Sequence, residues 1–285
     1  MKFYELMQEW LEFHALSVSQ ATVYNYSKSV QILKSSIGQM NVEEMSREDI
    51  QSLFIDFFHR GLRTNTMINY GKPINQALKF AVSKGYISES PYVGITIPKT
   101  EEYEIKPFTE GEVEKLLELD LPLWFRDAVQ LAFRTGMRKS EIFALSKNDI
   151  DLGNAFLMVR HTQSMIQEGY VVLKSPKTKG SKRRIALDNI SMEILRRRYA
   201  TCKEYIFEKN GEMMVPSSIN SMLRRRCKQA GIVIHRFHDL RHPYVKHTTK
   251  KYNSEKQKTQ ATKMDLIAWG FCFCIVSYSK RSWTL

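Results

Sequence analysis

The sequence predicts a mainly helical protein of two domains, with a small antiparallel β-sheet in the second domain. Three observations predict this fold class. Apolar residues recur at helical spacing in four stretches before residue 85, a stretch near residue 100 lacks periodicity, and three short strand-like segments lie between residues 156 and 187. At about 100–200 residues per domain, 285 residues suffice for two domains. We expect a helical domain at 1–95, a linker at 96–106 and a mixed α/β domain at 107–285.

Start and stop signals bound the four helices expected in the first domain. Ser19 is a good N-cap, and Ser46 followed by Asp49 resembles a capping box. Glycines then mark the ends of three of the helices. The expected helices run from Phe3 to Ala15, from Ser19 to near Gly38, from Ser46 to Gly61 and from Thr64 to Gly85.

The second domain follows a linker that contains Pro98 and an acidic run. A break at Gly136 and a turn at 149–152 interrupt its first helices. A lysine-rich turn separates the last two of its three expected strands. The expected helices are 109–117, 121–133, 140–145, 190–199 and 217–230, and the expected strands are 156–159, 170–173 and 184–187.

The charge balance favours a polyanionic partner. The chain holds 43 Lys and Arg against 30 Asp and Glu, a formal net charge of +13, and the excess is clustered. The four cysteines lack zinc-site spacing, and no uncharged apolar run approaches the roughly 18 residues of a membrane span. The N-terminus does not resemble a signal peptide. We therefore expect a soluble, intracellular protein in a reducing compartment, with DNA or RNA as partner and no membrane association.

Two short motifs carry the candidate chemistry. His238 and Arg241 lie one helical turn apart, so both side chains can reach one small anion. About a hundred residues upstream, Arg138 follows the break at Gly136. Each arginine has a structural alternative, either a salt bridge or a nonspecific phosphate contact. We interpret the runs at 196–198 and 224–226 mainly as solvated helix faces.

Together these motifs resemble the tyrosine recombinase, or phage integrase, family. The resemblance covers residues 1–242 and implies a helical core-binding domain at 1–95 and a catalytic domain at 107–285. Its most specific marks are Thr135-Gly136-Met137-Arg138-x-Ser140-Glu141 with Leu145 and Asp149 behind it, Pro176-Lys177-Thr178-Lys179, and His238-Asp239-Leu240-Arg241-His242.

The resemblance implies that DNA is cut and rejoined through a 3′-phosphotyrosine intermediate, without metal, ATP or another cofactor. Phosphoryl transfer concentrates negative charge on the nonbridging oxygens, and two guanidinium forks with an imidazole are suited to stabilise that charge. The resemblance assigns this role to Arg138, Arg241 and His238. Lys177 is the candidate general acid for the leaving 5′ oxygen, and Lys179 is its nearest rival.

Glu141 follows Arg138 by three residues, so its carboxylate is placed to orient a guanidinium or imidazole group. The equally open alternative is an exposed helix carboxylate. For contacts with the duplex, the candidates are Arg63, Lys72, Lys179, Lys182 and Arg183.

Residues 243–285 depart from the family pattern. Pro243 follows His242 directly, which is awkward for a continuing helix. Tyr278 is the candidate nucleophile because it lies nine residues after Trp269, the interval typical of the family. The alternative is that Tyr278 ends an apolar packing segment. A truncated or frame-altered C-terminus is one hypothesis for this departure.

The resemblance predicts a site-specific recombinase or integrase of a phage or other mobile element. It is expected to bind double-stranded DNA, to self-associate in a synaptic complex and to reside in the cytoplasm, at the nucleoid of a bacterial host. Two alternatives stay open. One is a noncatalytic DNA-binding relative acting as an accessory or regulator, and the other is a relaxing enzyme similar to type IB topoisomerases.

Overall fold

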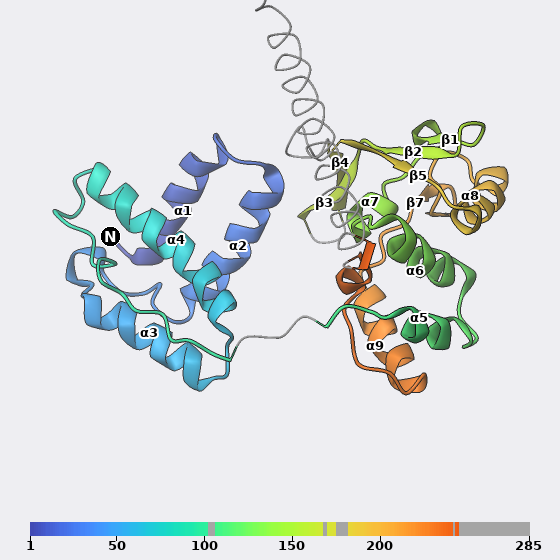
Figure 1. Cartoon of the computed structure of the whole chain (residues 1–285). Coiled ribbons are helices and arrows are strands. Elements are labelled where there is room, and N and C mark those ends of the chain that lie inside the picture. The colour runs from blue at the N-terminus through green and yellow to red at the C-terminus, as the bar shows by residue number, and fades with distance from the viewer. Residues whose placement is uncertain (102–105, 168–169, 175–181, 242, 245–285) are drawn as a thin grey trace, which may run out of the picture. The chain divides into compact units, whose positions relative to one another are not determined.

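A computed structural model of the chain describes residues 1–101, 106–167, 170–174, 182–241 and 243–244 (Figure 1). The chain separates into two compact units. The first comprises Met1–Glu104 with Gln163–Lys174, and the second comprises Ile105–Thr162 with Ser175–Leu285. Each unit has its own hydrophobic core.

Four helices build the core of the first unit, as the sequence predicted. Asp49 closes a capping box on Ser46, whose Oγ accepts a hydrogen bond from the Asp49 backbone N at 3.2 Å. The apolar stripes face inward, so Phe3, Phe54 and Ile74 are fully buried. The helices are α1 (Phe3–Ala15), α2 (Gln20–Lys34), α3 (Arg47–His59) and α4 (Thr64–Ser83).

The helices of the second unit gather around α6 (Leu123–Thr135), which contacts the neighbouring α7, α8 and η4 (Figure 1). Phe125, Ala128 and Leu131 of α6 are buried in this core. The other helices are α5 (Glu110–Leu117), α7 (Lys139–Ile142), α8 (Asn189–Thr201), α9 (Ile219–Gln229) and the 3₁₀ helices η2 (Lys147–Asp149) and η4 (Phe237–Arg241).

The strands form three small sheets among the described residues. β1 (Ile150–Asp151), β2 (Phe156–Val159) and β5 (Arg183–Ala186) make an antiparallel sheet in the order β1-β2-β5. β3 (Thr162–Gln167) pairs with β4 (Tyr170–Lys174), and β6 (Glu208–Lys209) pairs with β7 (Glu212–Met213). The expected fold class, mainly helical with a small antiparallel sheet, is confirmed.

Two expectations about this region were wrong. The turn predicted at 149–152 is instead the end of η2 followed by β1, because Asp149 completes the capping box with Ser146 at the start of η2 and Ile150 then pairs with Leu157 of β2. The three predicted strands do not form one sheet. β4 pairs with β3, whose polar sequence gave no strand signal.

No helix in the described ranges is both long enough and apolar enough to cross a membrane.

Candidate active site

A tight turn between α6 and α7 places Arg138. The hydroxyl of Thr135 donates to the carbonyl of Leu131 and accepts a hydrogen bond from the Met137 backbone N at 3.4 Å. Gly136 then adopts a φ of 62°, which L side chains rarely adopt, and a Cβ there would also collide with the ring of Tyr244. The Thr-Gly pair therefore ends α6 and reverses the chain just before the arginine.

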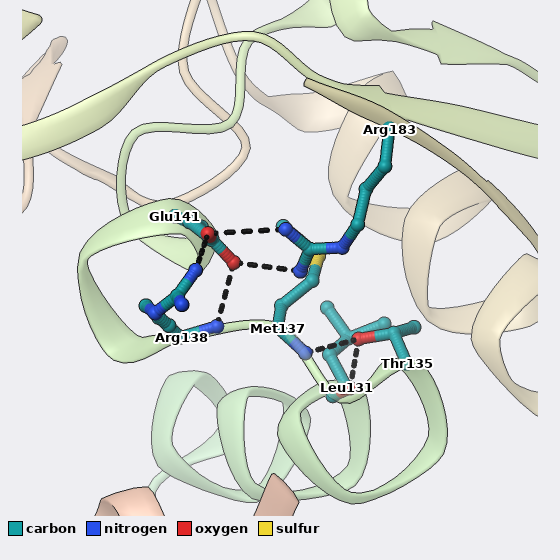
Figure 2. Close-up of polar contacts among 6 residues, drawn as sticks. All are labelled: Leu131, Thr135, Met137, Arg138, Glu141 and Arg183. Atoms are coloured by element: carbon teal, nitrogen blue, oxygen red, sulfur yellow. Dashed lines mark hydrogen bonds and ion pairs between the residues drawn. The ribbon is translucent and has the colours of Figure 1, made fainter. Parts of the chain in front are cut away.

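The carboxylate of Glu141 is the centre of this site (Figure 2). Glu141 Oε1 accepts hydrogen bonds from Arg138 Nη1 at 2.8 Å and Arg183 Nη1 at 3.1 Å. Its Oε2 accepts from the Arg138 backbone N at 2.8 Å and Arg183 Nη2 at 2.8 Å. The Glu141 side chain is only 2% exposed. It is therefore not an exposed helix carboxylate, and it orients two guanidinium groups.

These contacts keep Glu141 ionised. Burial raises the pKa of its carboxyl, but the hydrogen bonds from Arg183 and from the backbone and side chain of Arg138 outweigh burial, so the net pKa lies below its ordinary value. The side chain of Arg138 remains 48% exposed. Its charge is thus anchored at one edge and open to solvent at the other.

The second motif lies on η4, a 3₁₀ helix rather than the α-helical turn that was expected. Asn220 of α9 fixes its start, because Asn220 Oδ1 accepts a hydrogen bond from the Phe237 backbone N at 3.0 Å. The buried Asp239 accepts from the Arg236 backbone N at 2.8 Å. Side chains three residues apart eclipse each other in a 3₁₀ helix, so His238 and Arg241 still project from the same side.

The two motifs meet in the second unit. A cavity of about 340 Å³ has both Arg138 and His238 in its wall. Arg241 is half-buried, and burial lowers the pKa of its guanidinium, as do the positive charges of Arg138 and Arg183, while Glu141 opposes them. The cavity is lined by Arg138, Lys139, Ser140, Asn220, Arg236, Phe237 and His238.

Several residues predicted for the site fall outside the described residues, namely Lys177, Lys179, Trp269 and Tyr278. Among the DNA-binding candidates, Arg63 at the start of α4, Lys72 within α4 and Lys182 before β5 are exposed.

Sequence reasoning missed the Arg183–Glu141 pair. Arg183 was named only as a candidate for DNA contact, yet its guanidinium fork binds Glu141 (Figure 2). The pairing is non-local, since Arg183 and Glu141 lie 42 residues apart in the sequence, and no local pattern signalled it. The arginine runs were also misjudged in part. Arg197 and Arg198 both pair with Asp127, whose side chain is 1% exposed.

Comparison with known proteins identifies the family. Residues 106–254, more than half of the chain, match the phage integrase family, and residues 2–101 match the phage integrase SAM-like domain. The chain belongs to the phage integrase family. Its site motifs at 135–141 and 238–241 fall within the first match, whereas residues 255–285 lie beyond it.

Similar proteins include other integrases and tyrosine recombinases. A tyrosine recombinase XerC-like protein of Caldanaerobacter subterraneus subsp. tengcongensis is 26% identical, covering 85% of this chain and 70% of that protein. The integrase of transposon Tn1549, in complex with a circular intermediate DNA, has a TM-score of 0.76 at 18% identity and covers 88% of this chain and 87% of its own. Lambda integrase, as a tetramer bound to a Holliday junction, has a TM-score of 0.69 at 19% identity, and the match covers 85% of this chain and 71% of the lambda integrase chain. These structures share the fold of this phage integrase family member.

Proposed function

We propose that this protein is a site-specific DNA recombinase, which cleaves and rejoins DNA through a 3′-phosphotyrosine intermediate. One observation carries the proposal. Arg138, His238 and Arg241 converge in the second unit, with Glu141 buried beneath Arg138. Membership in the phage integrase family supports the same activity.

The geometry suits charge stabilisation during phosphoryl transfer. The attacked phosphodiester gains negative charge on its nonbridging oxygens, and fixed guanidinium and imidazole donors stabilise it without reorganising. In this proposal Arg138 and Arg241 bind those oxygens, and His238 donates a further hydrogen bond. Lys177 protonates the leaving 5′ oxygen, and Tyr278 attacks the phosphorus.

We further propose how the chain engages DNA. Residues 1–95 form the core-binding domain, 96–106 the linker and 107–285 the catalytic domain, and together they hold a duplex. Arg63, Lys72 and Lys182 present exposed positive charge suited to backbone phosphates. Lambda integrase forms a tetramer on a Holliday junction, which supports self-association of this chain on DNA. The protein acts in the cytoplasm, at the nucleoid of a bacterial host.

The family match ends at residue 254, before the candidate nucleophile, and this favours one second candidate function. In that case the protein binds DNA without cleaving it and acts as an accessory or regulator. Phosphate binding by Arg138, His238 and Arg241 would be retained, and the covalent step would be absent.

A nicked suicide substrate tests the proposal, because loss of a short fragment traps any covalent intermediate. Sites are first recovered from genomic DNA that the full chain binds. The recombinase is expected to form a protein–DNA adduct at a defined position, stable to denaturant and removed by protease. Binding without any adduct supports the noncatalytic function. An adduct at many unrelated sequences, with relaxation of supercoiled DNA, indicates a relaxing enzyme instead.

A further inference from the structure

Arg183 and Arg138 share Glu141 unequally. Arg183 contributes both terminal nitrogens of its guanidinium to the two carboxylate oxygens, at 3.1 and 2.8 Å. Arg138 contributes one side-chain nitrogen, Nη1, and its backbone N. The strong bidentate position on the carboxylate is therefore held by Arg183.

This division leaves most hydrogen-bond donors of the Arg138 side chain available. Its Nε and Nη2 have no partner within the ranges that the structure describes, and its side chain is 48% exposed beside the cavity that His238 also lines. Arg183 is 29% exposed and has its fork turned to Glu141. Arg138 is thus the guanidinium that can grip an incoming anion, and Arg183 is the one that cannot without releasing Glu141.

Removing Arg183 would change how the side chain of Arg138 pairs with Glu141. The carboxylate is buried, and a buried carboxylate that loses a charged partner needs another. Arg138 is the guanidinium already bonded to it, and a planar fork can rotate from one-point to two-point pairing. A two-point pair with Glu141 would use the donors that otherwise face the cavity.

We propose that Arg183 is a positioning residue, which occupies the carboxylate of Glu141 so that the guanidinium of Arg138 stays available to a DNA phosphate. The proposal rests on the proposed function for its meaning in catalysis. Arg183 itself does not touch the phosphate in this arrangement. Its contribution reaches the reacting group through Glu141 and Arg138.

The neighbouring residue on β5 offers a matched control. Successive side chains of a strand point to opposite faces, and the guanidinium of Arg184 lies 3.6 Å over the ring of Phe156. Arg184 has the same charge as Arg183 and lies equally close to the basic cluster. Arg183→Gln and Arg184→Gln therefore remove the same charge from the same strand, but only the first removes the partner of Glu141.

The test measures cleavage and affinity separately on a verified suicide substrate. At saturating DNA, Arg183→Gln is expected to lower the single-turnover cleavage rate by about tenfold or more, since misplacing one charge-stabilising donor costs at least that much. Its affinity for the duplex should stay within about threefold of wild type. Arg184→Gln should leave the cleavage rate within about twofold. Loss of affinity in proportion to cleavage would make Arg183 an ordinary phosphate contact and overturn the proposal.

A double-mutant cycle identifies Glu141 as the intermediary. In a Glu141→Gln background the carboxylate no longer competes for Arg138, so adding Arg183→Gln should slow cleavage by only about threefold or less. Independent, multiplying effects of the two substitutions would contradict the proposal. Thermal unfolding of every variant shows whether the fold is retained, and Arg183→Lys, which keeps the charge but lacks the fork, should recover only part of the rate.

A second readout needs no cleavage. Inorganic phosphate binding is followed by ³¹P NMR, and the component that Arg138→Gln abolishes reports the cavity. Arg183→Gln should weaken that component by about tenfold, and Arg184→Gln should leave it unchanged. If wild type forms no adduct yet shows this pattern, the proposed function fails and the role of Arg183 stands. Equal phosphate affinity in wild type and Arg183→Gln would overturn the role of Arg183, whatever the cleavage assay gives.

Discussion

The imidazole of His235 stacks on the ring of Phe108, with ring centroids 4.0 Å apart and ring planes inclined by 29°. Its Nδ1 lies 2.9 Å from the carbonyl oxygen of Lys106, and its Nε2 lies 3.3 Å from Glu112 Oε1. The side chain is 2% exposed. His235 thereby fastens the segment leading to His238 onto the residues that open the second unit.

His235→Ala is expected to destabilise the protein by about 2–3 kcal/mol, because it removes a buried ring that stacks on Phe108 and two part-buried polar contacts. Urea unfolding of the full chain measures the change. His161→Ala is the control, since the His161 side chain is 44% exposed and lies 3.9 Å from Asp149, beyond hydrogen-bond distance. Equal stability of the two variants would refute the structural role of His235.

Arg198→Ala is expected to cost about 1–3 kcal/mol, because it removes one of two charged partners from a buried carboxylate. The side chain of Arg198 is 15% exposed, donates to Asp127 at 2.7 Å and lies 4.3 Å over the ring of Phe207. Arg197→Ala should cost less stability, because the Arg197 side chain is 43% exposed. Arg196 is exposed, and its replacement should change stability by no more than about 0.5 kcal/mol. Denaturant midpoints rank the three variants, and identical values would contradict this order.

These arginines illustrate what the sequence could and could not predict. The helix bearing them was predicted because apolar periodicity and capping are local, and the same holds for α1 to α4. The partner of Arg198 lies on α6, 71 residues away, and the spacing on one helix says nothing about a second. The pairing of the strands could not be predicted for the same reason. β2 pairs with β5 across 23 intervening residues, a pairing that no local pattern specifies.

Acid should remove a stabilising contribution from Glu141. Burial raises the pKa of this carboxyl, but the bonds from Arg183 and Arg138 outweigh burial and hold the folded-state pKa below its ordinary value. Since the unfolded chain has a pKa of about 4.3, the contribution is fully present above that pH and is lost as pH falls through the folded pKa. The stability difference between wild type and Glu141→Gln should therefore shrink as pH falls from about 5 to about 3. Urea unfolding across this range measures it, with Glu114→Gln, an exposed carboxylate of α5, as control. A difference independent of pH would contradict the assignment.

The candidate site was predictable in its residue types and only partly in its geometry. Arg138, His238 and Arg241 came from short motifs whose spacing fixes which side chains share a face. Their convergence depends on Asn220 holding the start of η4 and on η4 packing against α6, neither of which a local motif encodes. The involvement of Arg183 could not be predicted either, because strand register places it opposite Val159 and beside Glu141.

Arg241→Ala is expected to abolish cleavage while leaving most of the affinity for duplex DNA. A donor that stabilises charge developing in the transition state acts on the rate, and one lost donor costs about 10²–10³ in rate. Half-buried Arg241 lies where Arg138 and Arg183 add to the positive potential, so one guanidinium is a small part of the binding surface. Single-turnover cleavage and a filter-binding isotherm on the same substrate separate the two effects. Equal losses in both would make Arg241 a phosphate contact only.

Tyr278 is the proposed nucleophile, and the reasoning for it rests on spacing. It follows Trp269 by nine residues, and it lies outside both the described residues and the family match. The nearer tyrosine, Tyr244, has its ring against Gly136 and follows Arg241 by only three residues. Its ring is already committed to the turn that places Arg138, which leaves Tyr278 as the better candidate for attack.

Tyr278→Phe is the decisive substitution because it keeps the ring and removes only the hydroxyl. A phenol with a pKa of about 10 must lose its proton as it attacks, and a cluster of Arg138, His238 and Arg241 favours the phenolate. On a verified suicide substrate, wild type should form the covalent adduct and Tyr278→Phe should form none, with unchanged duplex affinity. Tyr244→Phe, which preserves the packing against Gly136, should still form it. An undiminished adduct from Tyr278→Phe would remove Tyr278 from the mechanism. If wild type itself forms no adduct, the cluster around Glu141 grips phosphate without an attacking group, and the noncatalytic function takes the place of recombination.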